Sequence, residues 1–315
     1  MNRFSIALIT VHNVGRTRPT VSHLQERRHA IVTELGKSDM LAPQLRPAAV
    51  LVFFLIAFGW SWGWWILGRP VGVSDLSDDR FTNILLCGSF GPMIAAFVAS
   101  FVAGGAGATK SWLGSLIKFR APWWCYLYTF LLLPLLALIA VTMLGMEAKI
   151  GWAKAAGTLV IAMVPNAIIG GIVFGQGPLG EEPGWRGWLQ PAAEKRSLFW
   201  APVFLGIIWA AWHAPLFGFE SFRQGIASIP IWLTGYTISL IAASCAFGAL
   251  YRWSRGSVPI CVFAHAVLNI TAASTSRLWA FDSSEYFFWF YVVVLTIFGV
   301  ITVCVDRLLG SRKTA

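Results

Sequence analysis

The sequence predicts an all-α membrane protein with about eight transmembrane helices, and three observations carry this prediction. Hydrophobic residues make up 57% of the 315 residues and charged residues only 12%, whereas soluble domains carry about 25% charged residues. The apolar residues lie in runs of about 20, the length that crosses a bilayer as a helix. Lys and Arg gather in alternate connections between these runs, as the positive-inside rule requires.

The first 47 residues differ in composition from everything after them. The segment is polar and basic, contains His12, His23 and His29, and has no apolar run long enough to span. Its apolar start at residues 4–11 is too short for a signal peptide and lacks a small-residue cleavage site. We therefore expect residues 1–47 to be a disordered tail, with translation from Met40 as the alternative.

Eight apolar runs after this tail are the predicted spans. They cover residues 48–67, 82–104, 122–145, 157–176, 199–217, 229–251, 257–275 and 286–305. The fourth and seventh are the most irregular, because the fourth contains Pro165 and Asn166 and the seventh carries His265 and Asn269. A basic tail, residues 306–315, follows the last span.

The net charge of +10 does not indicate a nucleic-acid partner, because the distribution of Lys and Arg along the chain explains it. With an even number of spans both termini lie on one side of the membrane. If that side is the cytoplasm, 18 of the 24 Lys and Arg residues are cytoplasmic and six lie outside. The positive-inside rule therefore favours cytoplasmic termini, in what we expect to be a bacterial cytoplasmic membrane.

Several features between and within the spans have simple interpretations. Residues 109–121 mix Lys and Arg with apolar residues and fit a short helix on the membrane surface or a plain basic loop. The aromatic residues at span ends, which include Trp64, Trp65, Trp123, Trp124 and Trp200, are expected to be interfacial anchors. The single cysteines Cys87, Cys125, Cys245, Cys261 and Cys304 have no metal-type spacing and are expected to be small buried hydrophobes.

Charge inside the apolar region is concentrated in one short sequence, Gly180-Glu181-Glu182-Pro183-Gly184-Trp185-Arg186. An ionisable side chain in a membrane helix costs about 2.5–3.5 kcal/mol even on lenient scales, so it indicates function. Residues four apart share a helix face, so Glu182 and Arg186 are expected to form an ion pair that leaves Glu181 as the free carboxylate. Pro183 is tolerated in the first turn of a helix, which predicts a helix start near Gly180 or Glu181.

Two histidines lie in the later spans. His213 follows Trp209 by four residues, so its ring can stack on the indole, and His265 precedes Asn269 by four, so both can act from one face. A general base and two hydrogen-bond donors are what peptide hydrolysis needs, and a carboxylate in a low-dielectric site becomes a better base. Counted along straight helices, His213 lies about 20 Å from the cytoplasmic face and His265 about 12 Å. Either a tilt of the fifth span or a fifth span that begins deeper must remove this difference.

These motifs occur together in a known family. Glu181-Glu182-x-x-x-Arg186, an aromatic-x-x-x-His213, the Gly256-Ser257 step and His265-x-x-x-Asn269 resemble the CAAX protease and bacteriocin-processing (CPBP) family, whose best-known branch is the type II CAAX prenyl endopeptidase. The resemblance covers about residues 150–275. The one departure is Trp209, where the family usually has Phe.

The resemblance implies an intramembrane glutamic endopeptidase in residues 48–305, with no metal or cofactor. In it, Glu181 would activate water with help from His213, while His265 and Asn269 would stabilise the oxyanion and Glu182 with Arg186 would support the site. The implied partners are membrane lipid and a peptide or membrane-protein substrate, with a lipidated substrate left open.

Two alternatives remain open from the sequence. In the first, Glu181, Glu182, His213 and His265 bind a metal ion of a membrane metalloprotease, although Arg186 beside the carboxylates opposes a cation. In the second, the chain is a non-enzymatic immunity or transport protein whose polar residues line a pathway.

Overall fold

The structure, a computed structural model, describes residues 46–68, 78–169, 177–223 and 226–311. The chain divides into Met1–Leu41 and Ala42–Ala315, and every described residue belongs to the second unit. The predicted tail and the alternative start at Met40 therefore lie outside the described residues. The described part is helical, apart from turns, loops and one isolated bridge between Ala148 and Trp279. The predicted all-α class is confirmed.

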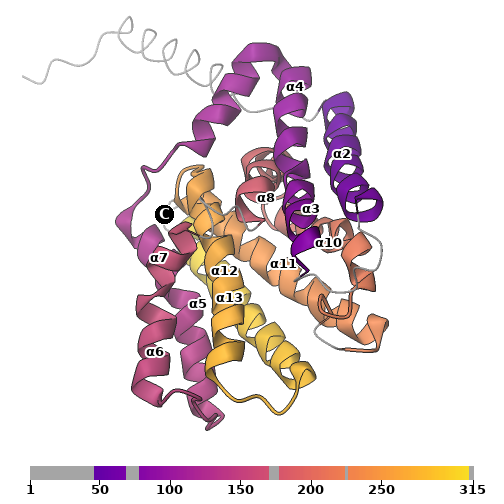
Figure 1. Ribbon diagram of the computed structural model, residues 1–315. Helices are drawn as coiled ribbons and strands as arrows, with labels where there is room; N and C mark the ends of the chain where they lie inside the picture. Colours follow the sequence, from indigo (N-terminus) through magenta and orange to yellow (C-terminus); the bar gives the residue numbers. More distant parts are fainter. Residues whose placement is uncertain (1–45, 69–77, 170–176, 224–225, 312–315) are drawn as a thin grey trace, which may run out of the picture. The chain divides into compact units, whose positions relative to one another are not determined.

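The helices follow one another along the chain as coloured in Figure 1. They are α2 (Pro47–Trp62), η1 (Gly63–Leu67), α3 (Asp79–Ser89), α4 (Gly91–Leu116), α5 (Trp123–Met143), α6 (Trp152–Ile161), α7 (Met163–Ile168), α8 (Pro178–Gly184), η3 (Trp185–Leu189), α9 (Gln190–Glu194), α10 (Trp200–Trp212), η4 (Ala214–Gly218), α11 (Ile229–Trp253), α12 (Val258–Leu278) and α13 (Ser284–Ser311). Here η1 and η3 are π-helical turns and η4 is a 3-10 turn.

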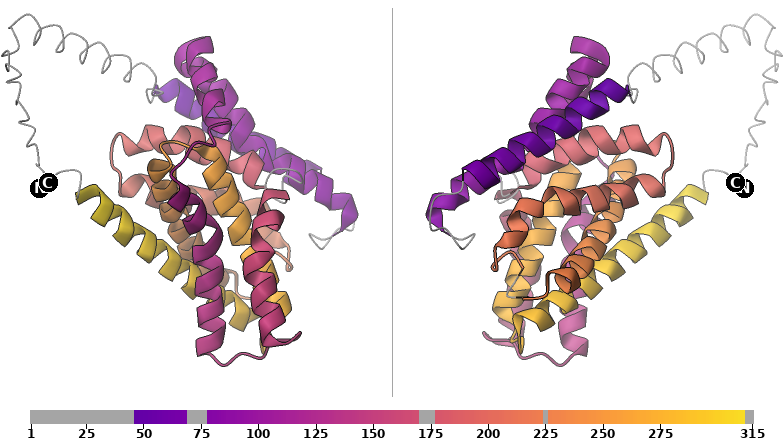
Figure 2. Two further views of the ribbon diagram at one scale, coloured as in Figure 1. Left: turned by 90° about the vertical axis from the view of Figure 1, so that its left-hand side faces the viewer. Right: turned by 90° about the vertical axis from the view of Figure 1, so that its right-hand side faces the viewer.

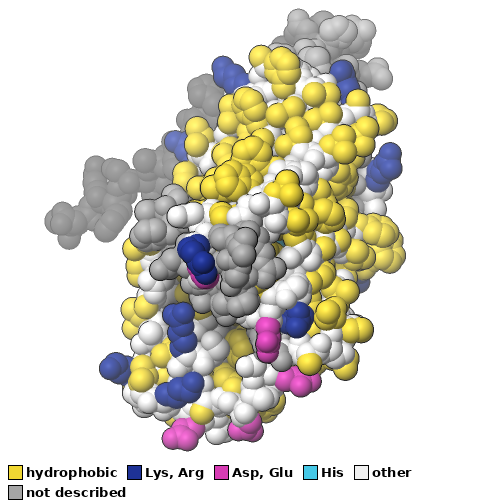
Figure 3. Space-filling view, turned by 45° about the vertical axis from the view of Figure 1, so that its right-hand side comes forward, with side chains coloured by type: hydrophobic (Ala, Val, Ile, Leu, Met, Phe, Trp, Pro, Cys, Tyr) yellow, Lys and Arg dark blue, Asp and Glu magenta, His cyan; other side chains and the backbone are white. Residues whose placement is uncertain are grey.

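Six helical stretches of the described part are long and apolar enough to cross a membrane, which makes the chain a polytopic membrane protein. They are Pro47–Leu67, Arg80–Leu116, Trp123–Met143, Ile229–Trp253, Val258–Leu278 and Ser284–Leu309. Figure 3 shows apolar side chains over most of one face, with acidic side chains only in its lower part. Leu51, Leu55, Phe97 and Phe101, on α2 and α4, are among the large apolar residues at the surface.

The fourth and fifth predicted spans contain shorter helices. Within residues 157–176, α6 ends at Ile161, because Pro165 has no N–H to donate to the carbonyl of Ile161. This span then passes beyond the described residues after Ile169. Within residues 199–217, α10 ends at Trp212, because Pro215 disfavours helical geometry in the residue before it.

The helix α12 occupies the centre of the bundle. It packs against α4, α5, α6, α7, α8 and α11, and every residue from Val258 to Leu268 is buried. A helix that is buried on all sides must lie in the interior of a bundle. Because His265 lies in this buried stretch, α12 carries it into the middle of the fold.

Helix α8 is held against the junction of α3 and α4 by two glycines, four residues apart. A Cβ atom would lie 2.5 Å from the carbonyl oxygen of Ser89 if added to Gly180, and 2.4 Å from that of Pro92 if added to Gly184. Small residues at this spacing let two helix backbones touch. The backbone of α8 is therefore positioned directly by the backbone of its neighbours.

The segment from α8 to α10 does not run parallel to the other helices. Figure 2 shows α8, α9 and α10 running across the direction of α5 and α6. Residue counts along a straight, upright fifth span therefore do not give the depth of His213. Both histidines nevertheless line one cavity.

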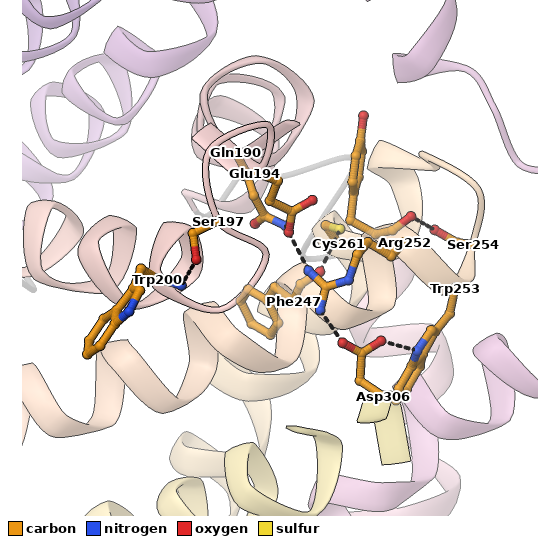
Figure 4. A network of polar contacts seen from close by, with 11 residues as sticks. Gln190, Glu194, Ser197, Trp200, Phe247, Arg252, Trp253, Ser254, Cys261 and Asp306 are labelled. Carbon is orange, nitrogen blue, oxygen red and sulfur yellow. Dashed lines mark hydrogen bonds and ion pairs between the residues drawn. The ribbon is translucent and has the colours of Figure 1, made fainter. Parts of the chain in front are cut away.

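Arg252, near the end of α11, ties three helices together. Its guanidinium contacts Glu194 of α9 and Asp306 of α13, as Figure 4 shows. Asp306 also accepts a hydrogen bond of 2.8 Å from the indole nitrogen of Trp253, and Glu194 accepts one of 2.9 Å from Gln190. Burial raises the pKa of the Glu194 carboxyl above its ordinary value, and the Arg252 guanidinium opposes that rise.

Some expectations for single residues are wrong. Trp65 is 2% exposed and donates to the carbonyl oxygen of Leu85, so it is a core residue, whereas Trp123 is 74% exposed as expected of an anchor. Of the predicted surface helix or loop at residues 109–121, the part up to Leu116 is helical and forms the end of α4 after a bend at Gly105, whose φ is 64°. All five cysteines are free, and Cys125 and Cys261 are buried as expected. Cys87 and Cys245 are only partly buried and Cys304 is exposed, so these three are not buried hydrophobes.

Candidate active site

Glu181 lies in the first turn of α8 with only 5% of its surface exposed. Its Oε2 accepts a hydrogen bond of 2.6 Å from the indole nitrogen of Trp209. Its Oε1 lies close to Gly177, where an added Cβ atom would come within 2.7 Å. The helix begins at Pro178, earlier than predicted, since Gly177 caps it with a φ of 89° that favours glycine. Glu181 is therefore a buried carboxylate with one oxygen engaged.

Glu182 contacts two cationic or ionisable groups at once. Its Oε1 lies 3.3 Å from Nη1 of Arg186 and 2.9 Å from Nδ1 of His265. Glu182 and Arg186 are completely buried, and they form the ion pair that the i, i+4 spacing predicts. The contact with His265 is not visible in the sequence, because 83 positions separate the two residues.

The guanidinium of Arg186 contacts two aromatic rings. Its central carbon lies 4.6 Å from the ring centroid of Trp209 and 5.1 Å from that of Phe247. A cation over an aromatic face is stabilised by the ring quadrupole, most strongly when water is excluded. These rings and Glu182 together hold the buried charge of Arg186.

His213 caps the end of α10, and its Nδ1 lies 2.9 Å from the carbonyl oxygen of Trp209. A carbonyl oxygen can only accept, so Nδ1 carries the proton and Nε2 of the neutral ring has a free lone pair. The expected stacking on Trp209 is wrong, since those rings are tilted by 46°. The imidazole stacks instead on Phe222 and Trp65, with interplanar angles of 29° and 12°.

His265 and Asn269 lie one turn apart on α12, as the spacing predicts. His265 is 5% exposed and meets the Trp209 ring edge-on at a centroid distance of 5.1 Å. Its Nδ1 is engaged by Glu182, so Nε2 is the nitrogen left for other contacts. Asn269 is partly buried.

A cavity of about 830 Å³ joins these groups. Glu181, His213, His265 and Asn269 all line it, so the structure brings all four predicted catalytic residues to one space. Glu182 and Arg186 are buried but are not among the residues that line it. The other lining residues are mainly apolar or aromatic, and they include Trp65, Trp212, Phe222, Trp232, Tyr236 and Phe288. A mostly apolar cavity with a few convergent polar groups is the usual form of a binding or catalytic site.

The metal hypothesis places Glu181, Glu182, His213 and His265 around one ion. Within the described residues, no three His, Cys, Asp or Glu side chains converge as metal ligands would. Glu182 is engaged by Arg186 and His265, and His213 by a backbone carbonyl. Glu182, His213 and His265 thus have protein partners at the atoms named here, which disfavours a shared metal ion.

Sequence reasoning missed two residues of this site. Trp209 is more than an aromatic neighbour of His213, because it is a hydrogen-bond donor to Glu181. Tyr236 lines the same cavity. An indole has a polar N–H, which is the signal at Trp209 that could have been used.

Comparison with known proteins points to one family. Residues 157–271 match the family model described as type II CAAX prenyl endopeptidase Rce1-like, and this range includes all six predicted site residues. A protein of Methanococcus maripaludis described as CAAX prenyl protease 2 is 31% identical over 96 residues, which are 29% of this chain and 34% of the relative. The match thus spans about a third of that relative's length. These findings confirm the resemblance that the sequence motifs indicate.

Proposed function

We propose that the protein, as a member of the CPBP family to which these comparisons point, is an intramembrane endopeptidase that hydrolyses a peptide bond without a metal ion. The observation that carries the proposal is the buried Glu181 carboxylate, which shares one cavity of about 830 Å³ with two imidazoles and a carboxamide. That arrangement supplies a base and potential oxyanion donors in one space.

Glu181 and His213 form the water-activating pair in this proposal. Oε2 of Glu181 is engaged by Trp209, so Oε1 is the oxygen that accepts a proton from the attacking water. Nε2 of His213 has the free lone pair that can accept a hydrogen bond from the same water or pass its proton onward. The proton then goes to the leaving amine, which must be protonated to depart.

His265 and Asn269 stabilise the developing oxyanion. A donor role for His265 requires a proton on Nε2 while Nδ1–H remains on Glu182, so the reactive form is the imidazolium. The Glu182 carboxylate, which also pairs with Arg186, stabilises this charge. The Asn269 amide, one helical turn away, supplies the second donor. Preorganised donors of this kind contribute about 2.7–4 kcal/mol each to transition-state stabilisation in known enzymes.

The proposed substrate is a peptide or the end of a membrane protein. The apolar and aromatic lining of the cavity suits apolar side chains or a lipid group. The relative described as a CAAX prenyl protease makes a prenylated substrate the first to test.

The test uses purified full-length protein in proteoliposomes with two peptides of identical sequence, one prenylated at its cysteine and one not. We expect hydrolysis of at least one peptide by the wild type and loss of that hydrolysis in Glu181→Gln. Hydrolysis by wild type and Glu181→Gln at equal rates would contradict the assigned base. A rate that depends on the prenyl group would identify the substrate class.

A further inference from the structure

Trp209 contacts four of the five charged or ionisable groups assigned to the site: Glu181, Arg186, His213 and His265. Its indole N–H donates to Glu181 at 2.6 Å, and its backbone carbonyl accepts from His213 at 2.9 Å. One ring face lies against the Arg186 guanidinium at 4.6 Å, and the ring meets His265 edge-on at 5.1 Å. The residue is only 1% exposed. A single side chain therefore connects α8, α10 and α12 at the cavity.

The bond to Glu181 has the greatest chemical consequence. It is the only hydrogen bond that this carboxylate receives from the part of the chain that the structure describes. A buried carboxylate without a donor is costly to ionise, and a donor to the charged form favours that form. The indole N–H also fixes which oxygen is engaged, because it binds Oε2 and leaves Oε1.

We infer that Trp209 is a positioning residue, whose indole N–H orients the Glu181 carboxylate and keeps it ionised for proton abstraction. This inference rests on the proposed function, in which Glu181 is the base. It concerns the indole N–H and not the aromatic ring, because a plain hydrocarbon ring could fill the space and contact Arg186 without donating to Glu181.

The other groups that face Glu181 cannot replace this donor. Glu182 is itself a carboxylate and disfavours the charge of Glu181, while Arg186 and His265 are bound to Glu182. His213 donates its Nδ1–H to a backbone carbonyl. Tyr236 also lies near Glu181, but no hydrogen bond joins the two in the described residues. The indole N–H thus has a distinct role in the site.

The decisive variant is Trp209→Phe. It keeps an aromatic ring and the backbone carbonyl that holds His213, and it removes the indole N–H. Infrared titration of Glu181, taken as the spectrum of the protein minus that of its Glu181→Gln counterpart, follows protonation of this carboxyl without any substrate. We expect the midpoint of this titration to move to higher pH in Trp209→Phe by about one to two pH units. This shift corresponds to the free energy of one hydrogen bond to a charged group.

The pH dependence of hydrolysis should shift in the same direction as the infrared midpoint. The acidic limb of the pH–kcat profile should move to higher pH in Trp209→Phe, with KM little changed, because the base is protonated more easily. At pH values below the shifted limb, the kcat of Trp209→Phe should be about 10- to 100-fold lower than that of wild type. At higher pH the two enzymes should have the same kcat.

Trp279→Phe is the matched control. Trp279 is also completely buried in the fold, but its indole nitrogen has no hydrogen-bond partner among the described residues and it does not line the cavity. This variant loses the same atoms from a packed interior. We expect it to lower thermal stability without moving the infrared midpoint or the pH profile.

The outcomes separate this inference from the proposed function. If the wild type cleaves no peptide but the infrared midpoint shifts in Trp209→Phe, the positioning contact stands and the proposed activity fails. Equal midpoints in wild type and Trp209→Phe would overturn the inference, whatever the activity. If Trp209→Phe does not fold, ultraviolet resonance Raman spectra of wild type and Glu181→Ala test the inference instead. The inference requires that the signal of one strongly hydrogen-bonded indole, that of Trp209, be present in wild type and absent in Glu181→Ala. Unchanged indole signals there would overturn it.

Discussion

Nδ1 of His265 lies 2.9 Å from Oε1 of Glu182, across 83 positions of sequence. The second glutamate of the pair therefore does more than neutralise Arg186. It joins α8 to α12 and fixes which imidazole nitrogen points toward the cavity. In the proposed mechanism it also stabilises the imidazolium form that His265 needs in order to donate to an oxyanion.

The first prediction concerns the base. Glu181→Gln keeps the shape of the side chain and can still accept from Trp209, but it cannot abstract a proton. We expect hydrolysis to fall by about 10²–10⁴-fold with thermal stability close to wild type. Glu147→Gln, an exposed change outside the cavity, should leave the rate unaltered. A Glu181→Gln enzyme as fast as the control would remove Glu181 from the mechanism.

The second prediction concerns the buried ion pair. Glu182→Gln and Arg186→Ala each leave a buried partner without its counter-charge, which costs about 3–5 kcal/mol. Both variants should therefore lose thermal stability as well as activity. Arg80→Ala breaks the exposed pair with Asp78 and should change neither. Stable but inactive Glu182→Gln or Arg186→Ala proteins would show that the roles of the two glutamates are wrongly divided.

The third prediction concerns metal ions. A water activated by Glu181 needs no metal, so hydrolysis should survive treatment with EDTA or phenanthroline. A metalloprotease would lose its nucleophile on chelation. Inhibition by either chelator that added zinc reverses would favour the metal hypothesis over the one proposed.

The fourth prediction concerns the N-terminal segment. A chain that begins at Met40 keeps every described helix, so we expect it to insert and to cleave as the full-length chain does. Membrane fractionation and the peptide assay measure the two properties. Failure to insert would show that the basic residues before Met40 are needed to set the orientation.

The fifth prediction concerns the contact between α9, α11 and α13. Arg252→Gln removes the cation that opposes the rise in the pKa of the Glu194 carboxyl. The ionised carboxylate then keeps its hydrogen bond from Gln190 but loses its counter-charge. Because a raised pKa makes the folded state less stable once the group ionises, the stability deficit should be largest at neutral pH and should shrink as acid protonates Glu194. Arg255→Gln, at an exposed position nearby, should show no such pH dependence in a thermal unfolding series.

Local spacing predicts the parts of the site that lie on one helix. The i, i+4 rule gives the pair between Glu182 and Arg186 and the shared turn of His265 and Asn269, because both depend only on helix geometry. It cannot give the contact between Glu182 and His265, or the bond from Trp209 to Glu181, because each joins separate helices.

Hydropathy is likewise limited as a predictor of how the helices are arranged. It identifies apolar runs, but it does not separate a helix that crosses the bilayer from one that lies across its neighbours, as α10 does. It also cannot tell a lipid-facing aromatic from a buried one. Trp65 lies at the end of an apolar run like an anchor, yet it is packed beside Trp212 and His213.

The close approach at Gly180 and Gly184 limits how this protein can change over evolution. Neither glycine offers a reactive group, yet any side chain there would collide with the carbonyl of Ser89 or Pro92 and push away the helix that carries Glu181. In a saturation mutagenesis screen, we expect these two positions to be as intolerant as the two glutamates between them. We expect descendants of this sequence to vary the apolar lining of the cavity much more freely than these two glycines, on which the position of α8 depends.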